Sequence, residues 1–348
     1  AVLNVWIVWA LHKRPTQLQY LMQWKASQQY LHAVCLLAGE QVPADQLLQS
    51  TCQALRLHEP GDFARAARDT QQLVFGHDAT LTTIFDSVRA HIELRRAQSS
   101  AHASGPLASF LLVGNPGIGK CYLTHLVARL LYSSGRVFHV NCDASATVRL
   151  TAASGAESEL ASSLRHEPFQ LILLENIQRL PVELFDVVRS LLQHGASTGD
   201  VGRRPVSVRG AVVVLTLDCA ASPRISQRAP KRDRAEDHRD LCQLLADEFS
   251  LPHELTQAIT NIITCPPLDD LSKSRIVERA LQDECAAHDI KLTACDKELI
   301  AAEILRLTPE RGMSDLHANV KRLLREPILA ALRDGQKKLA LRIHNASS

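Results

Sequence analysis

Phe110-Leu-Leu-Val-Gly-Asn-Pro-Gly-Ile-Gly-Lys-Cys121 is the stretch of this chain that decides its fold. An apolar run ends at Gly114, a glycine-containing loop follows, and Lys120 precedes an amphipathic run over residues 122–132. This is the strand, loop and helix order of a phosphate-binding loop with the spacing GxxxxGK. In such a loop the glycines allow backbone N–H groups to face a phosphate, the helix N-terminus adds partial positive charge, and the lysine reaches the terminal phosphates.

We therefore expect the loop to bind a nucleotide, with a triphosphate as the leading ligand and ATP or ADP as the cofactor. The alternative is a glycine turn that joins a strand to a helix by chance, which the apolar and amphipathic flanks disfavour. The residues predicted to contact the nucleotide are Gly114, Asn115, Pro116, Gly117, Ile118, Gly119, Lys120, Cys121 and Tyr122.

Cys121 departs from the motif, because Ser or Thr usually follows the lysine. The hydroxyl of that residue ligates Mg²⁺, a hard cation that prefers oxygen, whereas a thiol is a soft ligand. We expect Mg²⁺ binding to be possible but weakened, so that nucleotide binding survives where catalysis does not.

The composition sets the broad class of the protein. A chain of 348 residues predicts about two domains at ~150 residues each. The formal net charge of +2 gives no indication of a nucleic-acid or acidic-membrane partner. The nine cysteines form no CxxC pair and no metal-like spacing with histidine. This pattern predicts reduced thiols, and therefore a cytoplasmic location or another reducing compartment.

Residues 1–11 are nearly all apolar and precede His12-Lys13-Arg14. As a helix, this segment would span only ~16 Å, about half of the ~30 Å hydrocarbon core of a bilayer. We predict no membrane span and instead a buried or interface helix, within a helical N-terminal accessory region of residues 1–70. A truncated membrane helix is the alternative, because the chain has no initiator Met.

Apolar strands alternate with amphipathic helices around the glycine loop. The predicted strands are 110–114, 137–141, 169–174 and 211–217, and the predicted helices are 79–96, 122–132 and 182–193. Such alternation predicts a parallel sheet covered on both faces, the three-layer α/β class. The interleaved charges of residues 223–240 predict an exposed loop. After Pro266-Pro267 the pattern is mostly helical, so the predicted domains are residues 1–70, 71–265 and 266–348.

The order of these features resembles the second ATPase module of the Clp-type AAA+ unfoldases, over about Val74 to Ile343. The motifs that carry the resemblance are Val74-Phe-Gly-His-Asp78 at the entry, the GxxxxGK loop, Leu174-Glu-Asn-Ile-Gln-Arg179 at Walker B, residues 198–218 leading into sensor 1, Cys265-Pro-Pro-Leu268 before the lid and Gly312-Met-Ser-Asp-Leu316 at sensor 2. The resemblance implies a P-loop AAA+ three-layer α/β sandwich with a smaller, mostly helical C-terminal lid domain. It also implies other protein subunits as partners, in an AAA+ ring or a larger protein assembly.

Several positions depart from what the resemblance implies for ATP hydrolysis. Glu175 stands at the Mg²⁺-coordinating aspartate, and Asn176 stands at the glutamate that polarises the attacking water. An amide is not a useful general base. Asp218 replaces the sensor 1 asparagine, while Ala258 and Ser314 replace the arginine finger and the sensor 2 arginine. The cations that could substitute from nearby are Arg224, Arg228, Arg311 and Arg322.

The resemblance therefore assigns catalytic positions that are degenerate, namely Glu175, Asn176 and Asp218, and weak Mg²⁺ ligands, namely Cys121 and Glu175. The family also grips translocated chains with an aromatic residue in a Gly-aromatic-Val-Gly loop. The matching residues 150–157 are mostly small, and no aromatic residue lies between Phe138 and Phe169.

Three functions remain as hypotheses. The favoured one is a Clp-like ATP-binding protein with impaired hydrolysis, a pseudo-ATPase that serves as a structural or regulatory subunit of a protein assembly. The first alternative is an active ATP-dependent chaperone or unfoldase, in a ring whose neighbouring subunits supply the missing groups. The second alternative is a generic P-loop regulator that shares only the fold.

Overall fold

The computed structural model describes residues 55–57, 60–71, 73–97, 105–143, 145–151, 158–194, 206–219, 222–226, 234–306 and 312–342. All of them belong to one compact unit, residues 54–348. Several sequence predictions fall elsewhere in the chain. The parts of these predictions that lie outside the described residues are the apolar segment 1–11, most of the helical accessory region 1–70, the loop residues 152–157 and the start of the segment before sensor 1.

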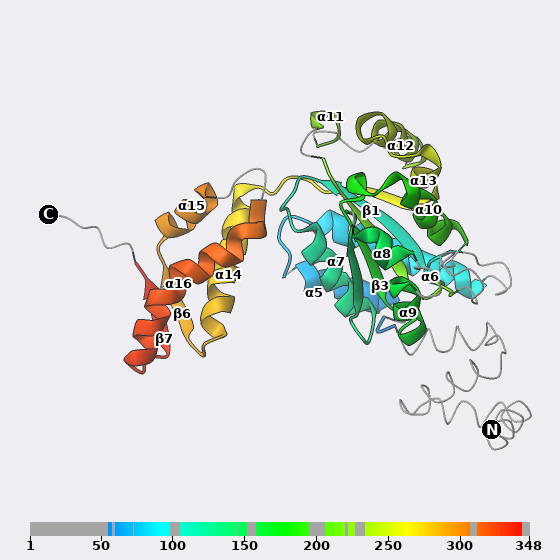
Figure 1. Ribbon diagram of the computed structural model, residues 1–348. Coiled ribbons are helices and arrows are strands. Elements are labelled where there is room, and N and C mark those ends of the chain that lie inside the picture. Colours follow the sequence, from blue (N-terminus) through cyan, green and yellow to red (C-terminus); the bar gives the residue numbers. More distant parts are fainter. Residues whose placement is uncertain are drawn as a thin grey trace, which may run out of the picture. The chain divides into compact units, whose positions relative to one another are not determined.

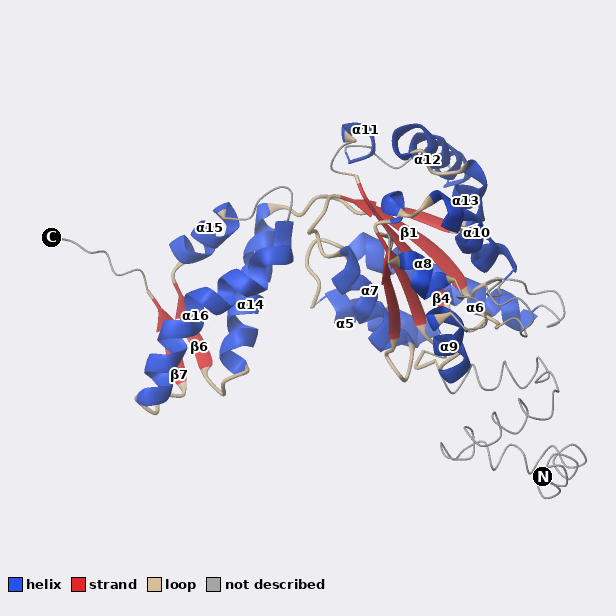
Figure 2. Cartoon of the chain, in the orientation of Figure 1, coloured by secondary structure: helices blue, strands red, loops and turns tan. Residues whose placement is uncertain are grey.

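Five parallel strands form the central sheet, which Figure 2 shows in red. The strands are β1 (Ala108–Gly114), β2 (Val137–Asn141), β3 (Leu171–Glu175), β4 (Val212–Asp218) and β5 (Asn261–Thr264). Their order across the sheet is β2-β3-β4-β1-β5. Every residue of β1 is buried, and β4 is buried up to its last residue, Asp218. The predicted α/β class with a parallel sheet is confirmed, and the arrangement is that of a P-loop AAA+ fold.

Each strand feeds two hydrophobic clusters, because successive residues of a strand point to opposite faces of the sheet. Leu111 and Val113 of β1 belong to the first cluster, whereas Phe110 and Leu112 belong to the second. The helices that pack into the second cluster are α5 (Pro60–Gln71), α6 (Asp78–Ala97) and α7 (Lys120–Leu131). Those that pack into the first are α8 (Ala146–Leu150), α9 (Glu159–His166), α10 (Phe185–His194), α11 (Pro223–Ser226), α12 (Arg234–Phe249) and α13 (His253–Ala258). Helices therefore cover both faces of the sheet (Figure 1).

The prediction of an exposed loop over residues 223–240 is wrong at both ends, because α11 covers Pro223–Ser226, with Ile225 buried, and α12 begins at Arg234. Interleaved charges suit the solvated face of a helix as well as a loop. Glu236 and Asp237 lie in the first turn of α12, where acidic side chains favour the positive end of the helix dipole. Leu241 and Leu245, one turn apart, are buried and hold the helix to the body. The predicted helix 182–193 also differs slightly, since it opens with a 3₁₀ turn, η3 (Val182–Leu184).

A third hydrophobic cluster gathers the elements that follow Pro267. These elements are α14 (Asp270–Ala286), β6 (Lys291–Cys295), α15 (Lys297–Leu305), η4 (Gly312–Asp315), α16 (Leu316–Arg333) and β7 (Lys338–Leu341). β6 and β7 pair with each other in parallel and do not extend the five-stranded sheet. The mostly helical pattern predicted for this part is thus observed, while the domain boundaries stay predictions.

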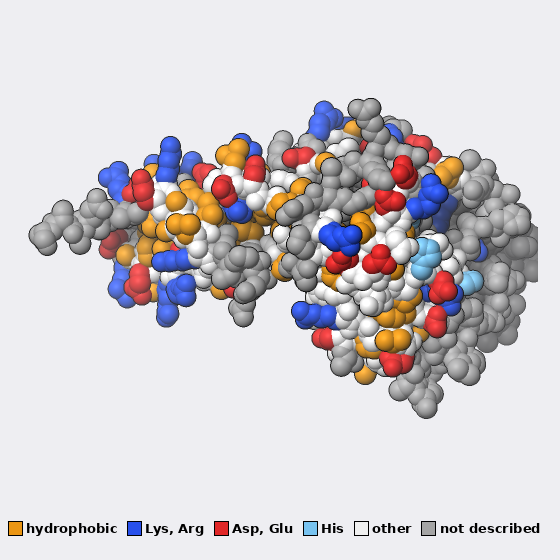
Figure 3. All heavy atoms as spheres, turned by 90° about the horizontal axis from the view of Figure 1, so that it is seen from above, with side chains coloured by type: hydrophobic (Ala, Val, Ile, Leu, Met, Phe, Trp, Pro, Cys, Tyr) orange, Lys and Arg blue, Asp and Glu red, His pale blue; other side chains and the backbone are white. Residues whose placement is uncertain are grey.

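Basic and acidic side chains are interspersed on the face shown in Figure 3, in line with the formal net charge of +2. The seven cysteines in the described ranges are free thiols. None of the helices that the structure describes is both long enough and apolar enough to cross a membrane.

Tyr132 ties the end of α7 to the turn before β4. Its side chain is fully buried, and its hydroxyl donates a hydrogen bond of 2.9 Å to the carbonyl oxygen of Gly210. Tyr132→Phe removes this donor from a buried carbonyl, which costs about 1–3 kcal/mol. We expect a loss of that size in the free energy of unfolding, measured by urea titration with circular dichroism. The matched control is Tyr122→Phe, because Tyr122 is 57% exposed. Equal losses in the two variants would contradict the prediction.

Candidate phosphate-binding site

The loop between β1 and α7 is shaped by its glycines. Gly117 and Gly119 have φ angles of 70° and 96°, in the left-handed region that favours glycine. Gly114 is tightly enclosed, because a Cβ there would lie 3.0 Å from the Cβ of Cys265. The helix α7 begins at Lys120, and no side chain caps its N-terminus. The loop thus leads the backbone around the positive end of a helix that has no side-chain acceptor of its own.

Lys120 lies at the centre of the site, with 5% of its side chain exposed. Its ammonium donates hydrogen bonds to the carbonyl oxygens of Gly114 at 2.8 Å and Asn115 at 2.7 Å, and to Oδ1 of Asp218 at 2.6 Å. Asp218 reaches the ammonium because β4 pairs with β1 in a register that places Asp218 opposite Gly114. An ammonium has three donors, so the protein itself satisfies all of them.

A second chain of hydrogen bonds joins Cys121, Glu175 and His139. The Cys121 thiol donates to Oε1 of Glu175 at 2.9 Å, and Nε2 of His139 lies 2.7 Å from Oε2 of the same carboxylate. The hydrogen bond from His139 is the main cause that lowers the pKa of Glu175, and the bond from Cys121 adds to it. Burial, reinforced by Glu175, raises the pKa of the Cys121 thiol. At neutral pH the pair is therefore a thiol and a carboxylate whose two oxygens are both engaged.

The Cys121 side chain does not suit a Mg²⁺ ion held directly by the protein. Mg²⁺ requires oxygen ligands in near-ideal octahedral geometry, whereas Cys121 offers a thiol that already donates to Glu175. In the ranges that the structure describes, no group of three or more His, Cys, Asp or Glu side chains is arranged to hold a metal ion. The two residues predicted as weak Mg²⁺ ligands are thus bonded to each other and do not converge on an open oxygen site.

Asn176 follows β3 in the left-handed region, with a φ of 62°. Asparagine adopts this conformation more readily than most residues other than glycine. Its backbone N–H donates to Oγ1 of Thr216 at 3.2 Å, and its side-chain amide donates to Oδ1 of Asn141 at 3.4 Å. Asn176 therefore contacts both β2 and β4, and it brings an amide where the resemblance implies a base.

The sequence analysis missed His139. It lies in the middle of β2, in register with Leu173 of β3, and its ring reaches across to Glu175. His125 of α7 lies beside it, with ring centroids 6.0 Å apart. Burial lowers the pKa of His125, and His139 lowers it further. The sequence offers one signal for His139, which is a titratable side chain in an otherwise apolar strand. It does not reveal the partner Glu175, because that pairing depends on the order of the strands in the sheet.

His77, in the predicted entry motif, supports the loop. Its side chain is buried, and its Nε2 lies 2.8 Å from the carbonyl oxygen of Ile118. A carbonyl oxygen only accepts, so Nε2 carries the proton of the neutral ring. Burial lowers the pKa of His77 and keeps it neutral. The entry motif, residues 74–78, therefore contains a residue, His77, that supports the loop through a hydrogen bond.

The sensor 2 segment lies beside the loop. The backbone N–H of Met313, in η4, donates to the carbonyl oxygen of Gly117 at 2.8 Å. Ser314 is the next residue, although its side chain lies outside what the structure describes. Ala258 ends α13 and packs against the first hydrophobic cluster, so that position offers no charge.

Two of the four arginines that could replace the arginine finger or the sensor 2 arginine are described by the structure, and both have other partners. Arg224 pairs with Glu248 at 3.2 Å. Arg322 donates to Oδ1 of Asn319 at 3.0 Å, within α16. Arg228 and Arg311 lie outside the described residues.

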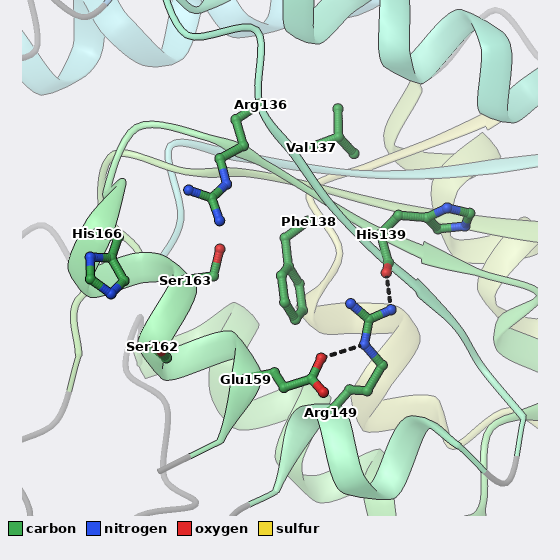
Figure 4. Close-up of a pocket in the computed structure, with 9 residues that line it drawn as sticks. All are labelled: Arg136, Val137, Phe138, His139, Arg149, Glu159, Ser162, Ser163 and His166. Atoms are coloured by element: carbon green, nitrogen blue, oxygen red, sulfur yellow. Dashed lines mark hydrogen bonds and ion pairs between the residues drawn. The ribbon is translucent and has the colours of Figure 1, made fainter.

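A separate cavity of about 510 Å³ opens along β2 (Figure 4). The Arg149 guanidinium lies 5.0 Å from the ring centroid of Phe138, and it donates to the carbonyl oxygen of His139 and, at 2.7 Å, to Glu159. In Figure 4 the ring of His139 points away from the cavity. Its backbone is thus held by Arg149, while its ring holds Glu175. The cavity is lined by none of the residues predicted for the phosphate site.

Comparisons with known proteins connect this chain to ClpB chaperones. It is 24% identical to the chaperone protein ClpB of Rhodopirellula baltica over 287 residues, which are 75% of this chain and 30% of that protein. It is 24% identical to the chaperone protein ClpB 1 of Parasynechococcus marenigrum over 319 residues, 85% of this chain and 34% of that protein. It is 23% identical to the mitochondrial chaperone protein ClpB4 of Arabidopsis thaliana over 280 residues, 75% of this chain and 28% of that protein.

The chain spans about a third of the length of these curated relatives. No family model matches it. The relatives, together with the five-stranded parallel sheet, support a relationship to the Clp-type AAA+ proteins.

Glu175→Gln tests the chain of hydrogen bonds from Cys121 to His139. Folding lowers the pKa of Glu175 below its ordinary value of 4.5. Its contribution to stability is therefore complete above that pH and is lost as the pH falls through the folded-state pKa. We expect Glu175→Gln to lower the free energy of unfolding at neutral pH and to have a much smaller effect in strong acid.

Urea titrations of the wild type and the variant at the two pH values measure this difference. The matched control is Glu183→Gln, because Glu183 is an exposed acidic residue of η3. A Glu175→Gln variant that is destabilised equally at both pH values would contradict a role for the charge.

Proposed function

We propose that this chain is a Clp-like AAA+ protein that binds ATP or ADP and hydrolyses ATP poorly, a pseudo-ATPase that serves as a structural or regulatory subunit of a protein assembly. The observation that carries the proposal is an intact GxxxxGK loop combined with an amide, Asn176, directly after β3. The loop retains the features that phosphate binding needs. The position after β3 lacks the group that hydrolysis needs.

The loop supports the binding of a nucleotide. Its left-handed glycines lead the backbone around the N-terminus of α7, which carries partial positive charge and no side-chain cap. Lys120 adds a full positive charge, which can exchange the carbonyl oxygen of Gly114 or Asn115 for a phosphate oxygen. We assign the phosphates to the backbone of residues 117–120 and to the ammonium of Lys120.

Hydrolysis needs a group that orients or deprotonates the attacking water. Asn176 offers only an amide. The two carboxylates of the site already have partners, since Glu175 accepts from Cys121 and His139, and Asp218 accepts from Lys120. Ala258 offers no cation to stabilise charge that develops on the transferred phosphoryl group. These features support slow or absent turnover.

The proposal extends to partners, location and domains. We propose other protein subunits as partners, in an AAA+ ring or a larger assembly, and a cytoplasmic location or another reducing compartment. The free thiols support the reducing compartment. The proposed domains are residues 1–70, 71–265 and 266–348, and the separate core of α14 to β7 supports the last of these.

The alternative function is an active ATP-dependent chaperone or unfoldase that works in a ring with neighbouring subunits. One observation favours it, since the relatives that this chain matches are named chaperone proteins. In such a ring the cation absent at Ala258 would come from a neighbouring subunit. Turnover by the wild-type chain distinguishes the two functions.

Lys120→Ala is expected to weaken nucleotide binding about tenfold or more, because a hydrogen bond to a charged group contributes about 1.5–3 kcal/mol. Isothermal titration calorimetry with ADP measures the affinity, in EDTA and again with Mg²⁺. The two wild-type values should differ little, because Cys121 offers a thiol where a hydroxyl would hold the ion. Lys273→Ala is the control, since Lys273 pairs with Asp270 on the surface of α14. A folded wild-type chain without affinity at millimolar nucleotide would contradict the proposal.

The wild-type chain is expected to release phosphate from ATP at or near the background rate. Loss of an arginine finger typically costs about 10³-fold or more, and loss of a stabilising donor about 10²-fold, although such losses are not additive. A coupled phosphate-release assay measures the rate.

A second experiment restores the residues that the resemblance implies for hydrolysis. This restoring variant combines Glu175→Asp, Asn176→Glu, Ala258→Arg and Ser314→Arg.

The matched control for the restoring variant carries Asn176→Gln in place of Asn176→Glu, since glutamine adds the same length without the carboxylate. Activity gained only with Asn176→Glu would support the loss of the base as the cause. A wild-type rate that is ordinary for an AAA+ enzyme would refute the pseudo-ATPase and favour the active chaperone.

A further inference from the structure

We propose that this site selects a nucleoside diphosphate over a triphosphate, and that Asp218 is the residue that sets the preference. This inference rests on the proposed function, because it takes the nucleotide phosphates to bind at residues 117–120. Beyond that function, Asp218 distinguishes the two nucleotides by the number of phosphate charges near Lys120.

Asp218 holds the ammonium that a terminal phosphate would need. Its Oδ1 lies 2.6 Å from Nζ of Lys120, closer than either backbone carbonyl that bonds this ammonium. The contact is sheltered from water, since the Lys120 and Asp218 side chains are 5% and 26% exposed. In a loop of this spacing the lysine reaches the β- and γ-phosphates. A γ-phosphate on Lys120 would therefore lie about 4–5 Å from the carboxylate, because both anions would bond the same nitrogen at about 2.8 Å.

The charges around this position give a γ-phosphate little compensation. The described site holds one ammonium, Lys120, and two carboxylates, Asp218 and Glu175. His139 offsets the charge of Glu175 only when it is protonated. A divalent cation that would offset the γ-phosphate meets the thiol of Cys121, which is already bonded to Glu175. Repulsion between anions is strong where solvent is partly excluded, so the third phosphate is disfavoured.

A diphosphate lessens this conflict, because its β-phosphate lies at the same distance from Asp218 but carries no further phosphate beyond it. Its phosphates lie against the backbone N–H groups of the loop and the first turn of α7. Lys120 can keep Asp218 and give the bond that it makes to Gly114 or Asn115 to the β-phosphate. Giving up one carbonyl acceptor costs less than separating a sheltered ion pair. The chain is therefore suited to hold a nucleotide in the state that hydrolysis would leave.

The test is an equilibrium titration of the full chain with ADP and with the β,γ-imido analogue of ATP, both in EDTA. We expect the wild type to bind ADP about tenfold or more tightly than the analogue. Asp218→Asn keeps the shape and an acceptor for Lys120 but removes the charge. In this variant the affinity for the analogue should rise about tenfold, and the preference should fall to within about threefold. The control is Asp270→Asn, because the Asp270 side chain is 88% exposed on α14 and its loss should leave the preference unchanged.

Equal wild-type affinities for the two nucleotides would overturn the inference while the proposed function stands. A preference that persists in a folded Asp218→Asn variant would overturn the role of Asp218. If neither nucleotide binds to the folded wild type, the proposed function fails and the inference fails with it. Should Asp218→Asn not fold, Asp218→Ser serves in its place, with the same expected loss of preference.

Discussion

A buried ammonium must have both its charge and its three donors satisfied, and in this chain that requirement organises the end of the sheet. Lys120 draws its acceptors from the last residue of β1, from the loop that follows and from the last residue of β4. Because β4 lies next to β1 in parallel register, the topology of the sheet supplies the carboxylate of Asp218. A lysine this well buried would be costly without that partner, so the loop, the helix after it and the strand order depend on one another.

The remaining polar chemistry gathers at the same edge, because parallel strands all end there. Glu175 ends β3 and Asp218 ends β4, each after a run of buried apolar residues. Cys121, in the first turn of α7, and His139, in β2, then reach Glu175 from the two sides. The result is a site whose acidic and basic groups are paired with one another. This pairing is in line with the proposed role of the site in binding a nucleotide.

Local patterns predicted four of the five strands of the central sheet and the helices next to the glycine loop, but not every element, and the pairs within the site needed the tertiary structure. The predicted strand 211–217 is observed as Val212–Asp218. It could be predicted because a strand buried on both faces has a continuous apolar sequence. The helix that begins at Arg234 was missed, since charges of both signs suit a solvated loop and a solvated helix face alike. Lys120 and Asp218 lie 98 residues apart, and His139 and Glu175 lie 36 residues apart. No local pattern reveals such pairs, because the strand order decides them.

Glu175 and Asp218 are the partly exposed tips of strands that are otherwise fully buried. A substitution one residue earlier, at Leu174 or Leu217, removes packed volume from the core, and truncating a buried leucine costs about 2–5 kcal/mol. A substitution at a tip alters charge and hydrogen bonding but opens no cavity. Selection for folding and selection for chemistry therefore act on different residues of the same strand. During evolution, the fold of such a sheet can therefore be retained while substitutions at the ends of its strands change the function of the site.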